Sequence, residues 1–141
     1  MTRSFVDTNL FVYVLDDEDP GKQAMAKALV RGLVAANDAV ISTQILQELY
    51  VTLRSRFAKS MTAADAAVIV RDYAELPVVQ VDAPIIVAAM ARVEAASISF
   101  WDALVVEAAL IAGATRLLTE VLQHGQIFAG RLRVENPFHS G

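Results

Sequence analysis

The stretch Phe5-Val6-Asp7-Thr8-Asn9 decides the fold that this sequence predicts. Residues 3–6 are short, β-prone and apolar at their end, so we predict a strand there. Asp, Thr and Asn are good helix caps, and apolar residues at helical spacing begin at Leu10. Ligands of open α/β sheets bind where strands end, which makes Asp7 a candidate site residue. The alternative is that Asp7 or Asn9 only caps a helix.

The rest of the chain repeats this order of strand and helix. We predict an α/β fold with a parallel β-sheet of four to five strands flanked by helices, in three layers (α/β/α). No linker or repeat divides the sequence, so residues 1–141 are predicted to form a single domain. The further strands are predicted at 38–41, 78–81, 116–118 and 132–134, and helices at 22–35 and about 43–58, after Thr62, after Asp82 and from about 99 to 112.

Apolar spacing also predicts which residues are buried. Met25 is predicted on the buried face of its helix, and Met90 is predicted to face inward in the helix after Asp82. The most apolar helix contains Trp101 and Ile111, and we predict that it is buried centrally. Residues 137–141 are predicted to be a loose tail.

Composition narrows the class of protein. The chain has 141 residues, 55% of them hydrophobic, and no cysteine, which excludes a disordered chain, disulfides and thiolate chemistry. The longest apolar run is too short to span a bilayer, so we expect a cytoplasmic protein without membrane contact. The net charge of −4 argues against a nonspecific nucleic-acid binder. Setting aside four candidate site acids leaves equal numbers of acidic and basic residues.

Each of those four acids comes after a predicted strand or near the start of a predicted helix. Asp7 and Glu120 come after predicted strands, Glu48 lies early in a helix after a strand, and Asp102 lies in the first turn of the most apolar helix. Such positions share one edge of a parallel sheet, so we expect the carboxylates to converge there. Converging carboxylates repel one another unless they take up protons or a cation. Mg²⁺, or alternatively Mn²⁺, suits such ligands and supports phosphoryl transfer.

Simpler interpretations remain open for several of these residues. Glu48 taken alone is a solvated helix glutamate, and Asp102 taken alone forms a capping pair with Ser99. Arg54, Arg56 and Lys59 form the densest basic cluster, which either complements a helix C-terminus or contacts the phosphates of RNA.

With these motifs the sequence resembles PIN domains, in particular the VapC-type toxins of toxin–antitoxin pairs. The resemblance rests on Phe5–Asn9, Gln47-Glu48-Leu49, Ser99–Leu104 and Thr119–Gly125, in this order. It implies a Mg²⁺-dependent endoribonuclease that forms homodimers and is blocked by a cognate antitoxin. It also implies that Asp7, Glu48 and Asp102 are the metal-site acids and catalytic residues, and that Asn9 supports Asp7 by hydrogen bonding.

One position departs from the pattern of this family. Similar sequences usually carry a fourth acid where this chain has Val121, which has no ligand atom. Glu120 is its neighbour, and we consider it as a substitute. A second metal and full catalytic rate are therefore in doubt, and a weakened module that binds RNA or antitoxin with little turnover is the alternative function. A small phosphatase that uses Asp7 is a third interpretation, although Asn9 stands where phosphatases of the haloacid dehalogenase type carry a second aspartate.

Overall fold

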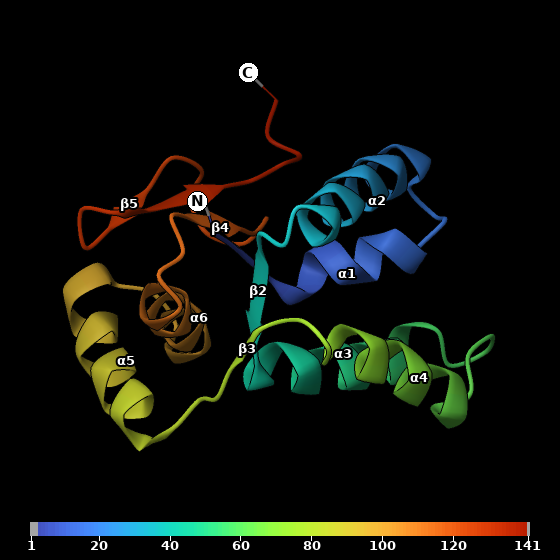
Figure 1. Cartoon of the computed structure of the whole chain (residues 1–141), viewed down its shortest axis with the longest axis horizontal. Helices are drawn as coiled ribbons and strands as arrows, with labels where there is room; N and C mark the ends of the chain where they lie inside the picture. Colours follow the sequence, from blue (N-terminus) through green and yellow to red (C-terminus); the bar gives the residue numbers. More distant parts are fainter. Residues whose placement is uncertain (1–2, 141) are drawn as a thin grey trace.

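The computed structural model describes residues 3–140, in which a pair of helices follows each of the first three strands and the last three strands follow one another (Figure 1). The strands are β1 (Ser4–Val6), β2 (Ala39–Ser42), β3 (Val78–Val79), β4 (Arg116–Leu118), β5 (Ile127–Phe128) and β6 (Leu132–Glu135). The helices are α1 (Thr8–Leu15), α2 (Pro20–Ala35), α3 (Thr43–Arg56), α4 (Ala63–Tyr73), α5 (Ala83–Ala96) and α6 (Phe100–Ile111).

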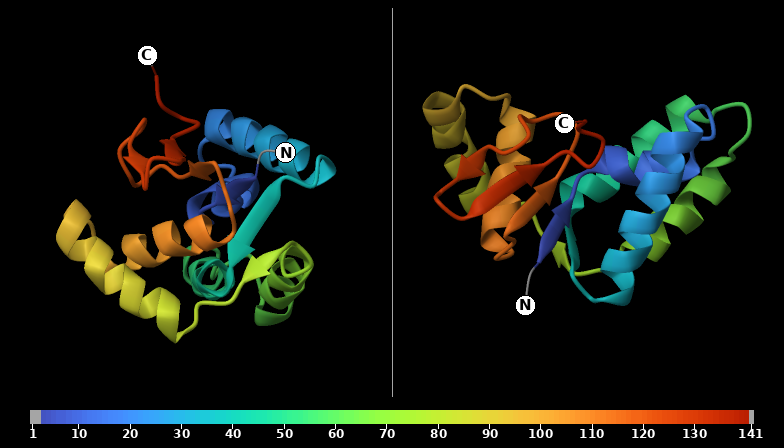
Figure 2. Two further views of the ribbon diagram at one scale, coloured as in Figure 1. Left: turned by 60° about the vertical axis from the view of Figure 1, so that its left-hand side comes forward. Right: turned by 90° about the horizontal axis from the view of Figure 1, so that it is seen from above.

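The strands form one sheet in the order β3-β2-β1-β4-β6-β5. All neighbouring pairs are parallel except β5 and β6, which form an antiparallel hairpin. In the right-hand view of Figure 2, α5 and α6 lie on one side of the strands and α1 to α4 on the other. The predicted α/β fold with a parallel sheet flanked by helices is therefore confirmed. The predicted count of four to five strands is wrong, because β5 adds a sixth, and β3 ends at Val79 rather than at residue 81.

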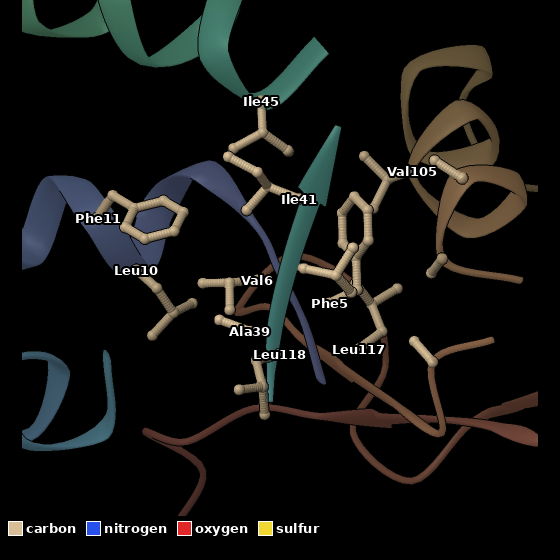
Figure 3. Close-up of a cluster of buried hydrophobic side chains, with 14 of the residues drawn as sticks. Phe5, Val6, Leu10, Phe11, Ala39, Ile41, Ile45, Val105, Leu117 and Leu118 are labelled. Atoms are coloured by element: carbon tan, nitrogen blue, oxygen red, sulfur yellow. The ribbon is translucent and has the colours of Figure 1, made fainter. Parts of the chain in front are cut away.

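The central strand β1 fixes the position of the site. Successive side chains of a strand point to opposite faces, and Figure 3 shows Phe5 beside Val105 and Leu117 while Val6 points toward Leu10. Phe5 is completely buried. Burial of such a side chain contributes roughly 2 to 3 kcal/mol, so β1 is held firmly on both faces. The strand therefore delivers Asp7, the next residue along, to a fixed place at the edge of the sheet.

Some burial predictions were wrong. Met25 is exposed because α2 turns Ala26, its neighbour, toward the core. Met90 is exposed on α5, in a helix that contacts the rest of the protein along one side and leaves the other side open. Trp101 and Ile111 are also exposed, although α6 as a whole is apolar. Helices of an outer layer keep one face in water, and isolated apolar residues are tolerated there.

The predicted loose tail is packed over part of its length. Phe138 lies edge-on to Tyr13, with 5.1 Å between the ring centroids, and His139 stacks on His124 at 4.2 Å. Residue 141 lies outside the described residues. The C-terminal segment therefore adds to the layer formed by α1 and α2.

Within residues 3–140, no single helix is long and apolar enough to cross a membrane. The pair α5 and α6 passes the same test of length and composition only when taken together, and these two helices meet at 115°.

Candidate active site

A cavity of about 610 Å³ lies at the carboxyl edge of the sheet. The predicted site acids Asp7, Glu48, Asp102 and Glu120 all line it. They arrive from different elements: Asp7 from the end of β1, Glu48 from α3, Asp102 from the first turn of α6, and Glu120 from the segment after β4. The structure therefore brings together the four acids that the sequence predicted to converge. We call this space the acid-lined cavity.

Asp7 is buried and held by three hydrogen bonds from neutral groups. Its Oδ1 accepts the backbone N–H of Thr8 at 2.8 Å, and its Oδ2 accepts the Thr119 hydroxyl at 2.7 Å and the Asn9 amide at 3.4 Å. Burial raises the pKa of Asp7 to about 6, the nearby charges of Glu48 and Asp102 add to the rise, and the bonds from Thr119 and Thr8 oppose it. Asp7 thus caps α1 and also lines the cavity, and its role as a site residue stays a prediction.

Glu48 is half-buried and bonded through both carboxylate oxygens. Oε1 accepts the Thr8 hydroxyl at 2.9 Å, and Oε2 accepts the Gln44 amide at 3.5 Å. The same amide nitrogen donates to the backbone carbonyl of Trp101 at 3.2 Å, which ties α3 to the start of α6. Glu48 is therefore not a freely solvated helix glutamate.

Asp102 reaches the cavity from the first turn of α6. Its backbone N–H donates to the hydroxyl of Ser99, the N-cap, at 3.0 Å. The predicted capping pair is therefore present, and the half-buried Asp102 carboxylate also lines the cavity.

Glu120 is held by a different kind of partner. Its carboxylate accepts a hydrogen bond from the Tyr13 hydroxyl and forms an ion pair with Lys22 at 2.7 Å. Partial burial works to raise the pKa of Glu120, but the Lys22 ammonium and the Tyr13 hydroxyl outweigh it and the pKa is lowered. Val121 is exposed on the cavity wall, and its backbone N–H donates to the Thr119 hydroxyl at 3.1 Å.

The predicted basic cluster does not act as one group. Arg54 donates to the carbonyl of Met61 at 3.0 Å, and Arg56 pairs with the buried carboxylate of Asp16. Lys59 is exposed. Of the three basic residues, Arg56 is the one that lines the acid-lined cavity. A contact of Arg54, Arg56 or Lys59 with RNA stays a prediction.

The acid-lined cavity fits a hard divalent cation in its chemistry. Carboxylates are the ligands that Mg²⁺ prefers, and an ionised carboxylate has about four lone pairs, of which Asp7 uses three. The side-chain oxygens of Asn9 and Gln44 are buried with no hydrogen-bond partner among the described residues. In that part of the chain no three Asp, Glu or His side chains already form a metal site. A cation held by three of these carboxylates at once would therefore require them to move toward one another.

The comparison with protein families agrees with this architecture. Residues 4–120 match the profile of the PIN domain. The chain belongs to the PIN domain family. Members of this family are usually metal-dependent nucleases, and those nucleases typically use Mg²⁺. The matched range ends at Glu120 and contains all four candidate site acids.

Solved structures share the fold of this PIN domain. A toxin–antitoxin complex from Klebsiella pneumoniae matches with a TM-score of 0.72 and 14% identity, covering 97% of this chain and 99% of the other. DNA-bound VapBC from Salmonella typhimurium matches with a TM-score of 0.68 and 17% identity, over 97% and 99%. Mycobacterium tuberculosis VapC20, a toxin that cleaves the sarcin–ricin loop, matches with a TM-score of 0.61 and 24% identity, over 81% and 86%. No curated protein matches the chain.

Three residues of this PIN domain site were missed from the sequence. Thr119 and Thr8 donate to Asp7 and Glu48, and Gln44 joins Glu48 to α6. Gln44 had a signal in the sequence, and the place of Thr119 is explained by the sheet. Gln44 lies four residues before Glu48, a spacing that places both on one helix face. Thr119 directly follows the strand beside β1, which places it next to Asp7.

Proposed function

We propose that this chain is a metal-dependent endoribonuclease toxin that cleaves RNA phosphodiester bonds and is neutralised by a cognate antitoxin. The observation that carries the proposal is the gathering of Asp7, Glu48 and Asp102 around one cavity of a PIN fold. Antitoxin-bound structures with the same fold support the second half of the proposal. Homodimer formation stays a prediction from the family resemblance.

In this proposal Asp7 and Asp102 hold Mg²⁺, with Mn²⁺ as a substitute, and Glu48 is a further ligand or orients a water molecule. Mg²⁺ bound there would supply a water of lowered pKa and positive charge beside the scissile phosphate. Thr119, Thr8 and Asn9 keep Asp7 in place by their hydrogen bonds. Gln44 and Thr8 do the same for Glu48.

In this proposal the RNA binds the cavity as an unpaired strand. The acid-lined cavity is lined by exposed apolar residues as well as by acids. Duplex RNA hides its base edges, whereas a single-stranded segment presents both its bases and its phosphates to such a wall.

The test is cleavage of end-labelled RNA by the purified protein. We expect cleavage with Mg²⁺ or Mn²⁺, loss of cleavage with a chelator, and loss of cleavage in Asp7→Asn. Asp72→Asn is the matched control, because Asp72 is an exposed acid on α4 that does not line the cavity. Cleavage that persists with the chelator, or in Asp7→Asn at the wild-type rate, would falsify the proposal.

A second candidate function is a weakened PIN module that binds RNA or antitoxin with little turnover. Val121 supports it, since the wall there offers no ligand atom, and the ion pair of Glu120 with Lys22 occupies the neighbouring acid. Val121→Asp distinguishes the two functions. A weakened module gains cleavage of about tenfold or more on receiving this acid. A wild type that is fully active without it shows little gain.

A further inference from the structure

Trp101 is exposed beside the catalytic acids, although it belongs to the most apolar helix of the protein. Its side chain is 63% exposed and lines the acid-lined cavity, and Asp102 is the next residue along α6. Nothing in the proposed cleavage chemistry uses this indole. A large aromatic surface left in water at the wall of a site is a feature that a ligand can cover.

The surroundings of Trp101 restrict its ring and its backbone separately. Its ring meets the ring of Phe100 edge-on, with 5.5 Å between centroids and 69° between planes. Its backbone carbonyl accepts the Gln44 amide, which also donates to Glu48. The backbone at Trp101 is therefore fixed by the same side chain that bonds Glu48, and the contact with Phe100 limits where the indole can lie, which lowers the entropy cost of covering it.

The neighbouring wall suits a single flat ring better than a protein segment. Val51 and Val121 are further exposed apolar residues that line the cavity, but Asp102, Glu48 and Gln44 line it as well. An amphipathic helix docks into a groove with a continuous apolar row. An unpaired nucleobase needs only one aromatic face to stack on, and every base offers one.

We infer that Trp101 is the stacking platform for one unpaired nucleobase of the RNA, next to the phosphodiester that the acids act on. The inference rests on the proposed nuclease function and adds a residue that fixes where the strand lies in the cavity. Because stacking accepts any base, Trp101 sets the register of cleavage along an unpaired strand more than the identity of the base.

Fluorescence tests the contact without requiring turnover. The chain has one tryptophan, so its emission reports on Trp101 alone. An unstructured RNA oligonucleotide titrated into Asp7→Asn protein, in which the RNA stays whole, is expected to quench this emission to saturation. The same strand annealed to its complement is expected to quench it weakly. Absence of quenching by the unpaired strand would overturn the inference and leave the wall free for a protein partner.

Kinetics then measures the contribution of the ring. In otherwise wild-type protein, Trp101→Ala is expected to raise KM roughly ten- to a hundredfold, whereas Trp101→Phe, which keeps a flat ring, is expected to stay within about threefold. Ile111→Ala is the matched control, because Ile111 lies on the same helix with 68% exposure and does not line the cavity. Circular dichroism checks that each variant is folded.

A substrate with one abasic nucleotide tests whether a single base acts through Trp101. In a series of substrates, the abasic nucleotide is placed at successive positions along the strand. We expect it to weaken cleavage by the wild-type protein at one position near the cut. At that position it should have no further effect on cleavage by Trp101→Ala. Additive effects would overturn the inference even if cleavage depends on Mg²⁺ and Asp7. Quenching that couples to one nucleotide without any cleavage would keep the inference and remove the nuclease proposal.

Discussion

Two walls of the acid-lined cavity hold carboxylates in opposite ways. On the first wall, which we call the Asp7 wall, lie Asp7, Glu48 and Asp102. Asp7 and Glu48 accept hydrogen bonds only from neutral hydroxyl and amide groups. On the second, the Glu120 wall, Glu120 is paired with the Lys22 ammonium and the Tyr13 hydroxyl. The pKa of Asp7 is raised and that of Glu120 is lowered.

The difference shows where the cavity still needs positive charge. Neutral donors orient a carboxylate without cancelling its charge, so the Asp7 wall is electrostatically unsatisfied at neutral pH. Lys22 already neutralises Glu120, which removes the reason for this carboxylate to take up a second cation. A divalent cation is therefore expected on the Asp7 wall, and Glu120 is expected to be a poor substitute for the acid that Val121 lacks.

The largest effect is expected from removing a charge from the Asp7 wall. Asp102→Asn keeps the shape of the side chain but removes a candidate ligand, so we expect cleavage of labelled RNA to fall about a hundredfold or more. Glu120→Gln, on the other wall, is expected to reduce cleavage less than tenfold. Equal losses in the two variants would show that the walls do not differ in function.

Loss of a neutral donor is expected to destabilise the protein. Thr119→Val removes the hydroxyl that donates to Asp7 at 2.7 Å, and a bond to a charged group contributes about 2 kcal/mol. Urea unfolding at pH 8 measures this loss. Thr115→Val is the control, because the hydroxyl of Thr115 makes only an exposed bond of 3.4 Å to a backbone carbonyl. A Thr119 variant as stable as this control would contradict the assigned role.

Removing the charge of Asp7 is expected to stabilise the folded protein. Its pKa rises from 3.8 to about 6 on folding, so the folded state favours the protonated form. The metal-free protein therefore loses stability as the pH rises from about 4 to 6, and the full penalty is present above pH 6. This penalty is present at pH 8 and disappears as the pH falls toward 4. Asp7→Asn should therefore be more stable than wild type by about 1 kcal/mol in chelator at pH 8, after allowing for one lost acceptor.

Stability near pH 4 tests the sign of that effect. There the wild-type carboxyl is largely protonated in the folded protein, so the advantage of Asp7→Asn should vanish in the same unfolding experiment. An advantage that does not change with pH would point to packing rather than to charge.

The smallest effect is expected on the Glu120 wall. Lys22→Gln removes the partner charge of Glu120 and leaves one more unpaired carboxylate in the cavity. We expect the affinity for Mg²⁺, measured by calorimetry, to rise about threefold. The double variant Lys22→Gln with Glu120→Gln should return to the wild-type affinity. A rise that survives in the double variant would show that Glu120 is not the added ligand.

Sequence reasoning located the elements more reliably than the edges of the sheet. The apolar strand of residues 3–6 and the alternation of strands and helices predicted the parallel sheet, because both are local patterns. The strand Ile127–Phe128 was not predicted, because two residues are too few to show the alternation of apolar and polar residues that is typical of a strand. Their pairing with β6 depends on a turn in which Ala129 and Gly130 both have positive φ.

The acids of the candidate site were predictable, but the hydrogen bond that Asp7 accepts from Thr119 was not. Asp7, Glu48 and Asp102 stand at strand ends and helix starts, positions that a parallel sheet brings to one edge. The bond from Thr119 to Asp7 depends on the register of β4 beside β1, which pairs Leu118 with Val6. The exposure of Trp101 depends on how α6 is rotated in its layer, and a helix apolar on all sides carries no signal for that rotation.

The packed C-terminal segment has a practical consequence for handling the protein. Phe138 lies edge-on to Tyr13 and 5.1 Å from the Lys22 ammonium, so it supports the two groups that hold Glu120. An affinity tag or surface anchor joined after residue 140 would disturb the packing of Phe138 on Tyr13 and Lys22. One joined before Arg3 would extend from the amino end of β1, at the opposite edge of the sheet from the cavity. Immobilised binding assays are therefore best designed with the attachment at that end.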